Sequence, residues 1–227
     1  MGKALFITGT GTDIGKTYVT GLLVKKLAEA GYHAGYYKAA LSGAEKDAQG
    51  NLLPGDALFV KQMAKLDTPT EELVSYIYRE AVSPHLAAQI NHLPIDFDHV
   101  EKDFQRAKSK HDYLTMEGSG GIICPLRWDE RAHVIIDDLI LRLKLPVLVI
   151  ADAGLGTINA AVLTIEHLHA RKIPVRGVIL NNWAGGIMQE DNRKMIAEIT
   201  GVRVLCVVPH GAKDIDLDAQ ELASLYA

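Results

Sequence analysis

A glycine-rich stretch near the N-terminus has the residue types of a phosphate-binding loop. Residues 9–18 have the sequence GTGTDIGKTY and lie between an apolar run and a segment with helical periodicity. In such a loop, backbone N–H groups and a helix N-terminus converge on an anion, Lys16 reaches the β- and γ-phosphates, and the Thr17 hydroxyl ligates Mg²⁺. The usual motif has glycine where this chain has Thr10, so the loop is a variant with one extra residue. The alternative is a glycine-rich turn without a ligand.

Carboxylates suited to a magnesium nucleotide follow further along the chain. Glu117 ends a buried-strand pattern, and we expect a turn directly after it. The residues of that turn are Gly118, Ser119, Gly120 and Gly121. Asp56 opens a helical stretch, where it is either a second magnesium ligand or an N-cap, a position that Asp often occupies.

A second lysine belongs to the pattern of another buried strand. Lys38 is predicted at the carboxyl end of this strand, and Ser42 follows at the start of the next loop. A cation opposite Lys16 would neutralise an anionic substrate as it meets the γ-phosphate, which is the central electrostatic problem of phosphoryl transfer. The alternative is a solvated lysine without a role in chemistry.

The elements that must position these side chains are apolar strands and amphipathic helices in alternation. Strands that are apolar on successive residues are buried on both faces of a parallel sheet, and the alternating helices cover them. We therefore predict an α/β fold with a single doubly wound, mostly parallel sheet of the P-loop nucleoside triphosphate hydrolase type, formed by residues 1–227 as one domain. Ligands of such sheets bind outside the carboxyl ends of the strands. The predicted strands are residues 4–8, 33–39, 112–117, 146–152, 175–181 and 202–209; the predicted helices are 16–30, 96–110 and 157–172; and the longest predicted loop is 42–56.

Composition argues against several classes of function. The chain has 227 residues, 48% of them hydrophobic, which is enough to bury a large core, and its formal charge of −4 argues against binding to a nucleic-acid backbone. Cys124 and Cys206 lack metal-ligand spacing, and the nine histidines form no zinc motif. The sequence has no basic leader and no run of roughly 18 apolar residues, so we expect a cytoplasmic protein that binds neither nucleic acid nor membrane.

Taken together and in order, these motifs resemble those of the dethiobiotin synthetase family. The resemblance extends from near the N-terminus to about position 216, and the variant phosphate loop is the form that this family uses. The motifs are GTGTDIGKT, YYKAALSG, Asp56, SPH at residues 83–85, MEGSGG, GLGTINA, ILNN and VVP. The resemblance implies ATP- and Mg²⁺-dependent carboxylation and ring closure of 7,8-diaminopelargonic acid with CO₂. The implied product is dethiobiotin, formed with ADP and phosphate through a carbamate and a carbamic-phosphoric anhydride.

The resemblance also implies a role for each site residue. Lys38 would stabilise the carbamate, Lys16 would stabilise the transferring phosphoryl group, and Ser42 would contact the substrate. The residues that match the magnesium ligands of the family are Thr17, Asp56 and Glu117. The residues expected to bind ATP are Thr12, Asp13, Ile14, Gly15, Lys16, Thr17, Tyr18, Asp56, Glu117, Gly118, Ser119, Gly120, Asn181, Asn182, Pro209, His210 and Gly211. The residues expected to contact the diamine are Thr12, Lys38, Ser42, Gly156, Thr157 and Asn159.

Two of these assignments have simpler structural alternatives. Asn181 matches the family asparagine that pairs with the edge of adenine, whereas its spacing alone favours a turn residue. The GLGTINA segment matches the place where the substrate carboxylate meets a helix N-terminus at a two-fold dimer interface, which implies a homodimer. Without the resemblance, ordinary helix capping explains the same residues. The aromatic residue that the family often contributes from the partner subunit has no counterpart between Gly185 and Gly201.

Other classes of nucleotide-binding protein share the predicted fold. A nucleotide-switch ATPase of the partition type has a variant phosphate loop with an additional early lysine, and residues 9–13 contain no lysine. Amidoligases of cobalamin synthesis normally add a glutamine-handling domain, for which we expect no room in this chain. A pure ATP-binding module would not need Lys38 and Ser42 opposite the phosphates. The partition-type ATPase is the alternative function that we keep.

Overall fold

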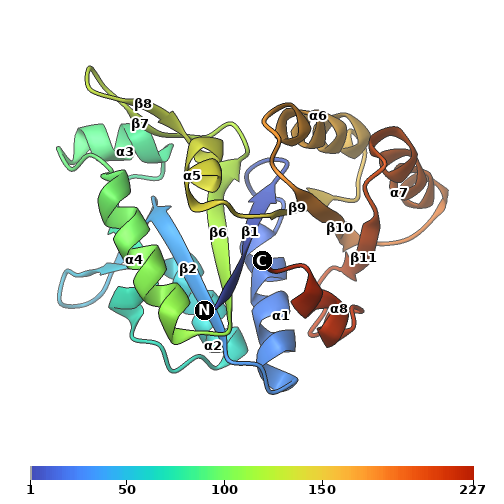
Figure 1. Cartoon of the computed structure of the whole chain (residues 1–227), viewed down its shortest axis with the longest axis horizontal. Helices are drawn as coiled ribbons and strands as arrows, with labels where there is room; N and C mark the ends of the chain where they lie inside the picture. The colour runs from blue at the N-terminus through green and yellow to red at the C-terminus, as the bar shows by residue number, and fades with distance from the viewer. Residues whose placement is uncertain (1) are drawn as a thin grey trace.

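Seven parallel strands form the central sheet, in the order β11-β10-β9-β1-β6-β2-β5 (Figure 1). The computed structural model describes residues 2–227. Neighbouring strands run parallel throughout this sheet, which confirms the predicted α/β fold. The strands are β1 (Lys3–Gly9), β2 (Ala34–Leu41), β5 (Val74–Ile77), β6 (Tyr113–Gly121), β9 (Val147–Asp152), β10 (Val175–Trp183) and β11 (Val204–Pro209). All of the predicted strands are present, and β5 is an additional one.

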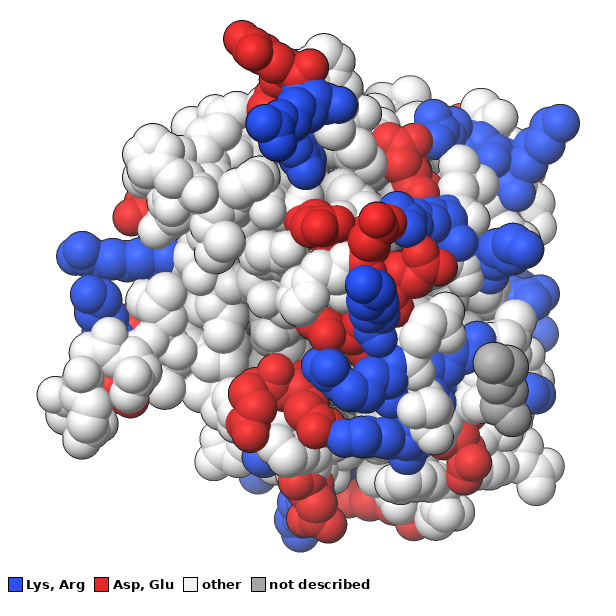
Figure 2. Space-filling view, turned by 60° about the vertical axis from the view of Figure 1, so that its left-hand side comes forward, with Lys and Arg blue, Asp and Glu red and all other residues white. Residues whose placement is uncertain are grey.

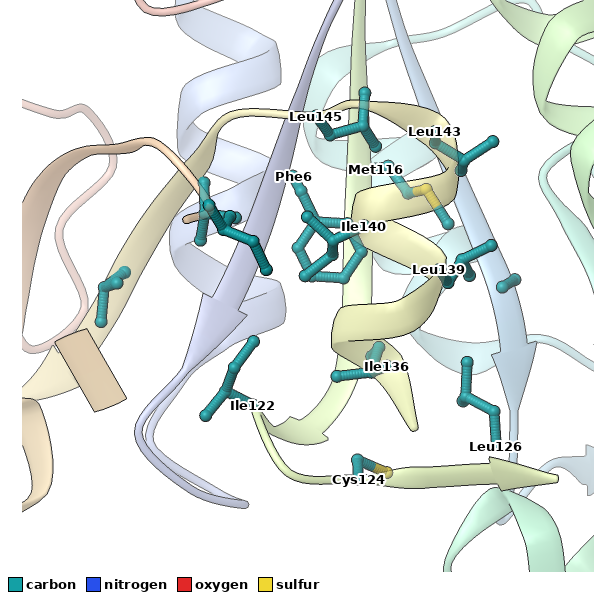
Figure 3. Close-up of a cluster of buried hydrophobic side chains, with 14 of the residues drawn as sticks. Phe6, Met116, Ile122, Cys124, Leu126, Ile136, Leu139, Ile140, Leu143 and Leu145 are labelled. Carbon is teal, nitrogen blue, oxygen red and sulfur yellow. The ribbon is translucent and has the colours of Figure 1, made fainter. Parts of the chain in front are cut away.

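Side chains of the central strands alternate between two buried clusters, one on each face of the sheet. On β1, Leu5 and Ile7 belong to one cluster and Phe6 to the other. Because both faces are covered, such strands are apolar at consecutive positions, which is why the apolar runs of the sequence predicted them. Figure 3 shows the cluster of Phe6, in which Phe6 and Met116 pack beneath the helix that carries Ile140.

Helices cover both faces of the sheet, as a doubly wound fold requires. The cluster of Leu5 and Ile7 is covered by α1 (Lys16–Glu29), α2 (Gly55–Ala64) and α8 (Ala219–Ser224). The cluster of Phe6 is covered by α3 (Pro84–Ile90), α4 (Phe97–Lys110), α5 (Ile136–Leu143), α6 (Thr157–Ala170) and α7 (Ile187–Thr200). The helices predicted from periodicity correspond to α1, α4 and α6.

The predicted loop of residues 42–56 contains a small hairpin, so this part of the prediction was wrong. Its strands are β3 (Glu45–Lys46) and β4 (Leu52–Leu53), which are too short to produce a periodic pattern. The side chain of Asp47 closes the hairpin by accepting from the backbone N–H groups of Gln49 at 2.9 Å and Asn51 at 2.8 Å. The remaining short elements are η1 (Thr70–Glu72) and the hairpin of β7 (Pro125–Trp128) and β8 (His133–Ile135).

The glycines after Glu117 continue a strand, so the turn predicted there was also wrong. β6 extends to Gly121. A Cβ at Gly118 would lie 2.8 Å from the ring of Phe6, so glycine at this position permits close packing inside the sheet. Only Gly120 in this run has a left-handed backbone, with φ of 62°. Gly118 therefore lets the backbone of β6 pack directly against the ring of Phe6, before the strand ends at Gly121.

Charged side chains of both signs are interleaved on the face drawn in Figure 2. Ion pairs join Arg142 to Asp98 and Glu101, and Lys110 to Glu72. Opposite charges therefore lie side by side on this face. Among residues 2–227, no helix combines the length and the apolar character needed to cross a membrane.

Candidate active site

The phosphate loop connects β1 to α1 at the carboxyl edge of the sheet. Asp13 and Gly15 have left-handed backbone, with φ of 58° and 81°. A Cβ on Gly15 would lie 2.1 Å from the amide nitrogen of Asn181, so both its conformation and its surroundings require glycine. α1 begins at Lys16 without a side-chain cap. The N–H groups of its first turn therefore remain available to an anion.

Lys16 is a buried lysine at the start of α1, with 8% of its surface exposed. Burial lowers the pKa of Lys16; the negative charge of Glu117 opposes this effect only in part, and the positive charge of Lys38 adds to it. An anion bound in the loop would favour the charged form of this lysine. The position is therefore well suited to a phosphate group.

A polar network of five side chains lies beside the loop. Thr17 Oγ1 donates to Glu117 Oε1 at 2.7 Å, and Lys38 Nζ donates to the same oxygen at 3.1 Å. Lys38 also forms an ion pair with Asp56. The other carboxylate oxygen, Glu117 Oε2, accepts from the hydroxyl of Tyr36 at 3.1 Å. The carboxylate of Glu117 is thus held by donors from both α1 and β2.

Lys38 is buried inside β2, not at its carboxyl end as predicted, and it is only 4% exposed. The alternative of a solvated lysine was therefore wrong. Burial by itself lowers the pKa of Lys38, but the charges of Glu117 and Asp56 raise it by more, so the pKa lies above its ordinary value and the side chain is an ammonium. The N-cap alternative for Asp56 was wrong as well, because Pro54 precedes α2 and the Asp56 side chain instead pairs with Lys38.

A cavity of about 820 Å³ adjoins this network. The predicted residues that line it are Thr12, Asp13, Gly15, Lys16, Thr17, Lys38, Ser42, Asp56, Ser119 and Gly120. The structure therefore brings both lysines and Ser42 to one space, whose volume is typical of small-molecule sites. Glu117 and Gly118 are buried and do not line the cavity.

Part of the cavity wall was missed by the sequence prediction. The additional lining residues are Leu41, Gly43, Ala81, Val82, Ser83, Pro84, Gly121, Ile123, Cys124 and Pro125. Residues 123–125 directly follow the glycine-rich end of β6, so the rule that ligands bind beyond the carboxyl ends of strands could have indicated them. Residues 81–84 follow β5, a strand that the sequence pattern did not reveal. Ser83 and Pro84 belong to the SPH motif of the resemblance, which assigned them no role at the site. Cys124 and Cys206 are buried free thiols.

The residues expected around adenine lie at the carboxyl ends of β10 and β11. Asn181 is 4% exposed, and its amide nitrogen donates to the carbonyl oxygen of Ile14 at 2.9 Å, so it supports the phosphate loop. The Tyr18 hydroxyl donates to the carbonyl oxygen of Ala212 and ties α1 to the segment after β11. Pro209, at the end of β11, is exposed, as are His210 and Gly211 directly after it. Asn182, with a left-handed φ of 57°, donates to Asp152 Oδ2 at 2.6 Å.

The GLGTINA segment begins α6 and does not line the cavity of its own chain. Gly156 has a left-handed φ of 90°, and no side chain caps the helix. Thr157 is 5% exposed, and its hydroxyl has no hydrogen-bond partner among residues 2–227. Asn159 is exposed. The helix N-terminus is therefore open to a ligand, but it is not part of the space beside Lys38.

The oxygen donors of Thr17, Asp56 and Glu117 fit a magnesium ion. They comprise a hydroxyl and two carboxylates, which are hard ligands of the type that Mg²⁺ prefers. Among the described residues there is no cluster of three or more His, Cys, Asp and Glu side chains. A magnesium ion at these residues would therefore take its other ligands from phosphate or water.

Comparisons with known proteins decide the family. A sequence model described as an AAA domain matches residues 3–215. An ATP-dependent dethiobiotin synthetase of Brachyspira hyodysenteriae is 48% identical over 227 residues, which are 100% of each chain. Another, of Clostridium botulinum, is 44% identical over 100% of this chain and 99% of the relative. This chain belongs to the dethiobiotin synthetase family.

Membership in the dethiobiotin synthetase family confirms the predicted class of enzyme, a ligase. The fold also occurs in proteins outside this family. A ParA family ATPase from Chlorobium tepidum aligns with 99% of this chain and 90% of its own, with a TM-score of 0.58 and 14% identity. At this identity the likeness shows the fold alone. Because full-length relatives carry the synthetase name, the partition-type alternative is not favoured.

Proposed function

We propose that this chain catalyses the ATP- and Mg²⁺-dependent carboxylation and ring closure of 7,8-diaminopelargonic acid with CO₂, forming dethiobiotin, ADP and phosphate. The observation that carries the proposal is the shared cavity, in which Lys38 and Ser42 line the same space as Lys16 and Thr17 of the phosphate loop. Full-length relatives with the synthetase name support this reaction. A protein that only bound ATP would not need Lys38 and Ser42 at this place.

Negative charge develops beside the two lysines in each step of the proposed reaction. An amine of the diamine adds to CO₂ and loses a proton, which gives a carbamate. A carbamate oxygen attacks the γ-phosphate and ADP leaves; the second amine then attacks the carbonyl carbon, closes the ring and releases phosphate. We assign the Lys38 ammonium to the carbamate and Lys16 to the transferring phosphoryl group, because fixed charges act most strongly where charge develops in a buried site. Ser42 would orient the diamine.

Thr17, Asp56 and Glu117 are the residues that would hold Mg²⁺. When bound, the ion neutralises charge on the β- and γ-phosphates. In the structure Lys38 contacts both carboxylates of this set. Lys38 therefore competes with any cation for these oxygens, while its third N–H donor remains free to contact a carbamate in the cavity that it lines.

We assign the carboxylate of the diamine to the N-terminus of α6 in a second subunit. An open helix N-terminus with an unpartnered, buried Thr157 hydroxyl suits an anion. The neighbouring surface is apolar, since Leu155 is 92% exposed and Ile187, at the start of α7, is 91% exposed. Sedimentation should therefore show a dimer, and Asn159→Trp should weaken diamine binding. A fully active monomer would contradict this assignment.

Adenine is assigned to the ends of β10 and β11, where Asn181 lies against the phosphate loop. The Tyr18 hydroxyl holds the segment after β11 beside α1, so both strand ends lie near the base of the loop. Asn181→Asp would replace the amide donor by a carboxylate. We expect this variant to bind an ATP analogue more weakly, measured by calorimetry, while its diamine affinity changes little.

Product analysis tests the proposed reaction directly. The protein is incubated with the diamine, ATP, Mg²⁺ and ¹³C-labelled bicarbonate, and products are identified by mass spectrometry. We expect a cyclic urea that carries the label, with ADP formed only when diamine and bicarbonate are both present. Parallel reactions with DNA in place of the diamine test the partition-type alternative. Failure of the complete reaction to give labelled urea would overturn the proposed function.

A further inference from the structure

Tyr36 is a buried tyrosine whose hydroxyl is committed to a carboxylate of the candidate active site. It is 1% exposed and donates to Glu117 Oε2 at 3.1 Å. Glu117 is itself 1% exposed. Its other oxygen, Oε1, accepts from Thr17 and Lys38. Among residues 2–227, Tyr36 is the only donor to Oε2, so its hydroxyl determines how that half of the carboxylate is held.

The environment of Tyr36 keeps its hydroxyl a donor. Its ring belongs to the apolar cluster of Leu5 and Ile7, where a phenylalanine would fill the same space. The contact of 3.1 Å with Glu117 Oε2 assigns the donor role to the phenol, because an ionised carboxylate only accepts hydrogen bonds. Packing explains the ring, whereas the hydroxyl is explained by its bond to Glu117.

We propose that Tyr36 is a positioning residue for the magnesium site, whose hydroxyl fixes Glu117 so that Oε1 faces Thr17. The inference rests on the proposed function, because Glu117 is a metal ligand only there. Hydrogen-bond partners behind a ligating carboxylate orient it, and their loss typically lowers metal affinity or activity about 10–100-fold. Tyr36 is such a partner, because its hydroxyl holds Oε2 of Glu117 while Oε1 accepts from Thr17.

The register of the sheet places this contact and also supplies a control. Lys38 on β2 lies opposite Glu117 on β6, and Tyr36 is two positions earlier on β2, hence on the same face. Tyr37 points to the opposite face and is 0% exposed. Its hydroxyl bonds with that of Ser75 at 2.6 Å and donates to the carbonyl oxygen of Val100 at 3.1 Å. The two tyrosines thus share strand and burial but differ in their partners.

The test compares Tyr36→Phe with Tyr37→Phe. Calorimetry measures Mg²⁺ binding to protein saturated with a non-hydrolysable ATP analogue, and the rate of urea formation is followed as a function of Mg²⁺ concentration. We expect Tyr36→Phe to weaken Mg²⁺ binding about 10–100-fold. The Mg²⁺ concentration for half-maximal rate should rise accordingly, with a smaller effect on the rate at saturating Mg²⁺. Tyr37→Phe should leave the Mg²⁺ titration at the wild-type value. Both variants should unfold at a lower temperature than the wild type, because each lacks buried hydrogen bonding of a tyrosine hydroxyl.

A second background separates positioning from general stability. Glu117→Asp shortens the side chain by one methylene, which withdraws the carboxylate from the Tyr36 hydroxyl. Adding Tyr36→Phe to Glu117→Asp should then change Mg²⁺ affinity by no more than about twofold. Equal shifts from Tyr36→Phe and Tyr37→Phe, no shift from Tyr36→Phe, or a full effect in the Glu117→Asp background would each overturn the inference. If the wild-type protein shows no Mg²⁺-dependent binding of the nucleotide, the proposed function fails instead.

Discussion

Replacing Lys38 with methionine tests how far its ammonium compensates the buried carboxylate beside it. Methionine has a long, flexible and apolar side chain, so the change removes the charge without opening a large cavity. It leaves Glu117, which is 1% exposed, without the Lys38 partner at 3.1 Å. It also unpairs Asp56, whose side chain is 40% exposed. Removal of the Lys38 ammonium should therefore cost more stability through Glu117 than through Asp56.

The cost of Lys38→Met comes mainly from Glu117. Removing one partner of a buried ion pair typically costs about 3–5 kcal/mol. Glu117 keeps its hydrogen bonds from Thr17 and Tyr36, which places the expected loss near the lower end. The more exposed pair with Asp56 adds at most about 1 kcal/mol. We expect the free energy of unfolding to fall by about 3 kcal/mol.

Urea denaturation of a double-mutant cycle measures this effect. The proteins are wild type, Lys38→Met, Glu117→Gln and the double variant, with Lys26→Met as a control because Lys26 pairs with Asp214 on the surface. Glu117→Gln removes the charge that needs compensation, so Lys38→Met should cost less in that background, with a coupling of about 2 kcal/mol. Additive losses, or a Lys38→Met variant as stable as Lys26→Met, would refute the reasoning. Lys38→Met should also bind the ATP analogue normally but form none of the cyclic urea product from the diamine.

Three further predictions concern the phosphate loop and the thiols. Lys16→Gln should raise the barrier to urea formation by about 2.7–4 kcal/mol, as expected for loss of a transition-state donor, and near-normal turnover would remove Lys16 from the mechanism. Gly15→Ala should abolish binding of the ATP analogue, since its Cβ would meet Asn181 at 2.1 Å, whereas Gly50→Ala, which has a similar positive φ but open space around it, should leave binding unchanged. Burial raises the pKa of Cys124 to about 11 and that of Cys206 to about 12. Only about 10⁻³ of Cys124 is therefore thiolate at pH 8, and its alkylation should accelerate about tenfold per pH unit up to that pKa. The ATP analogue should protect Cys124, which lines the cavity, more than Cys206; rapid alkylation of both thiols in the native protein at pH 8 would contradict this prediction.

The sequence predicted the central strands well because both of their faces are buried. Val147–Asp152, for example, is apolar at consecutive positions, and its side chains enter both clusters. The edge strand β5 escaped prediction because it has only four residues and, with Ser75 in second place, is not apolar at consecutive positions. The end of β6 was misjudged for a different reason. Local propensity assigns a run of glycines to a turn, whereas Gly118 is needed to admit the ring of Phe6, a contact that only the folded sheet creates.

The candidate site was predictable where its residues are close in sequence. The phosphate loop with Lys16 and Thr17 follows from one local motif between a strand and a helix. The Tyr36–Glu117 hydrogen bond depends on the register of β2 against β6, which no local pattern specifies. Likewise, only the position of α2 relative to Lys38 shows that Asp56 forms an ion pair and is not an N-cap.

Stability alone does not explain why this sheet buries Lys38 and Glu117 next to each other. Removing two charges from water is costly, and a buried ion pair is often no more stable than well-packed apolar residues of similar volume. The pair lies beside the phosphate loop, where a charge held in place before reaction lowers the barrier because little reorganisation is needed. The double variant of the Lys38→Met and Glu117→Gln cycle tests whether the pair contributes to stability or to the reaction. If it is nearly as stable as the wild type but inactive, the pair is kept for its chemistry.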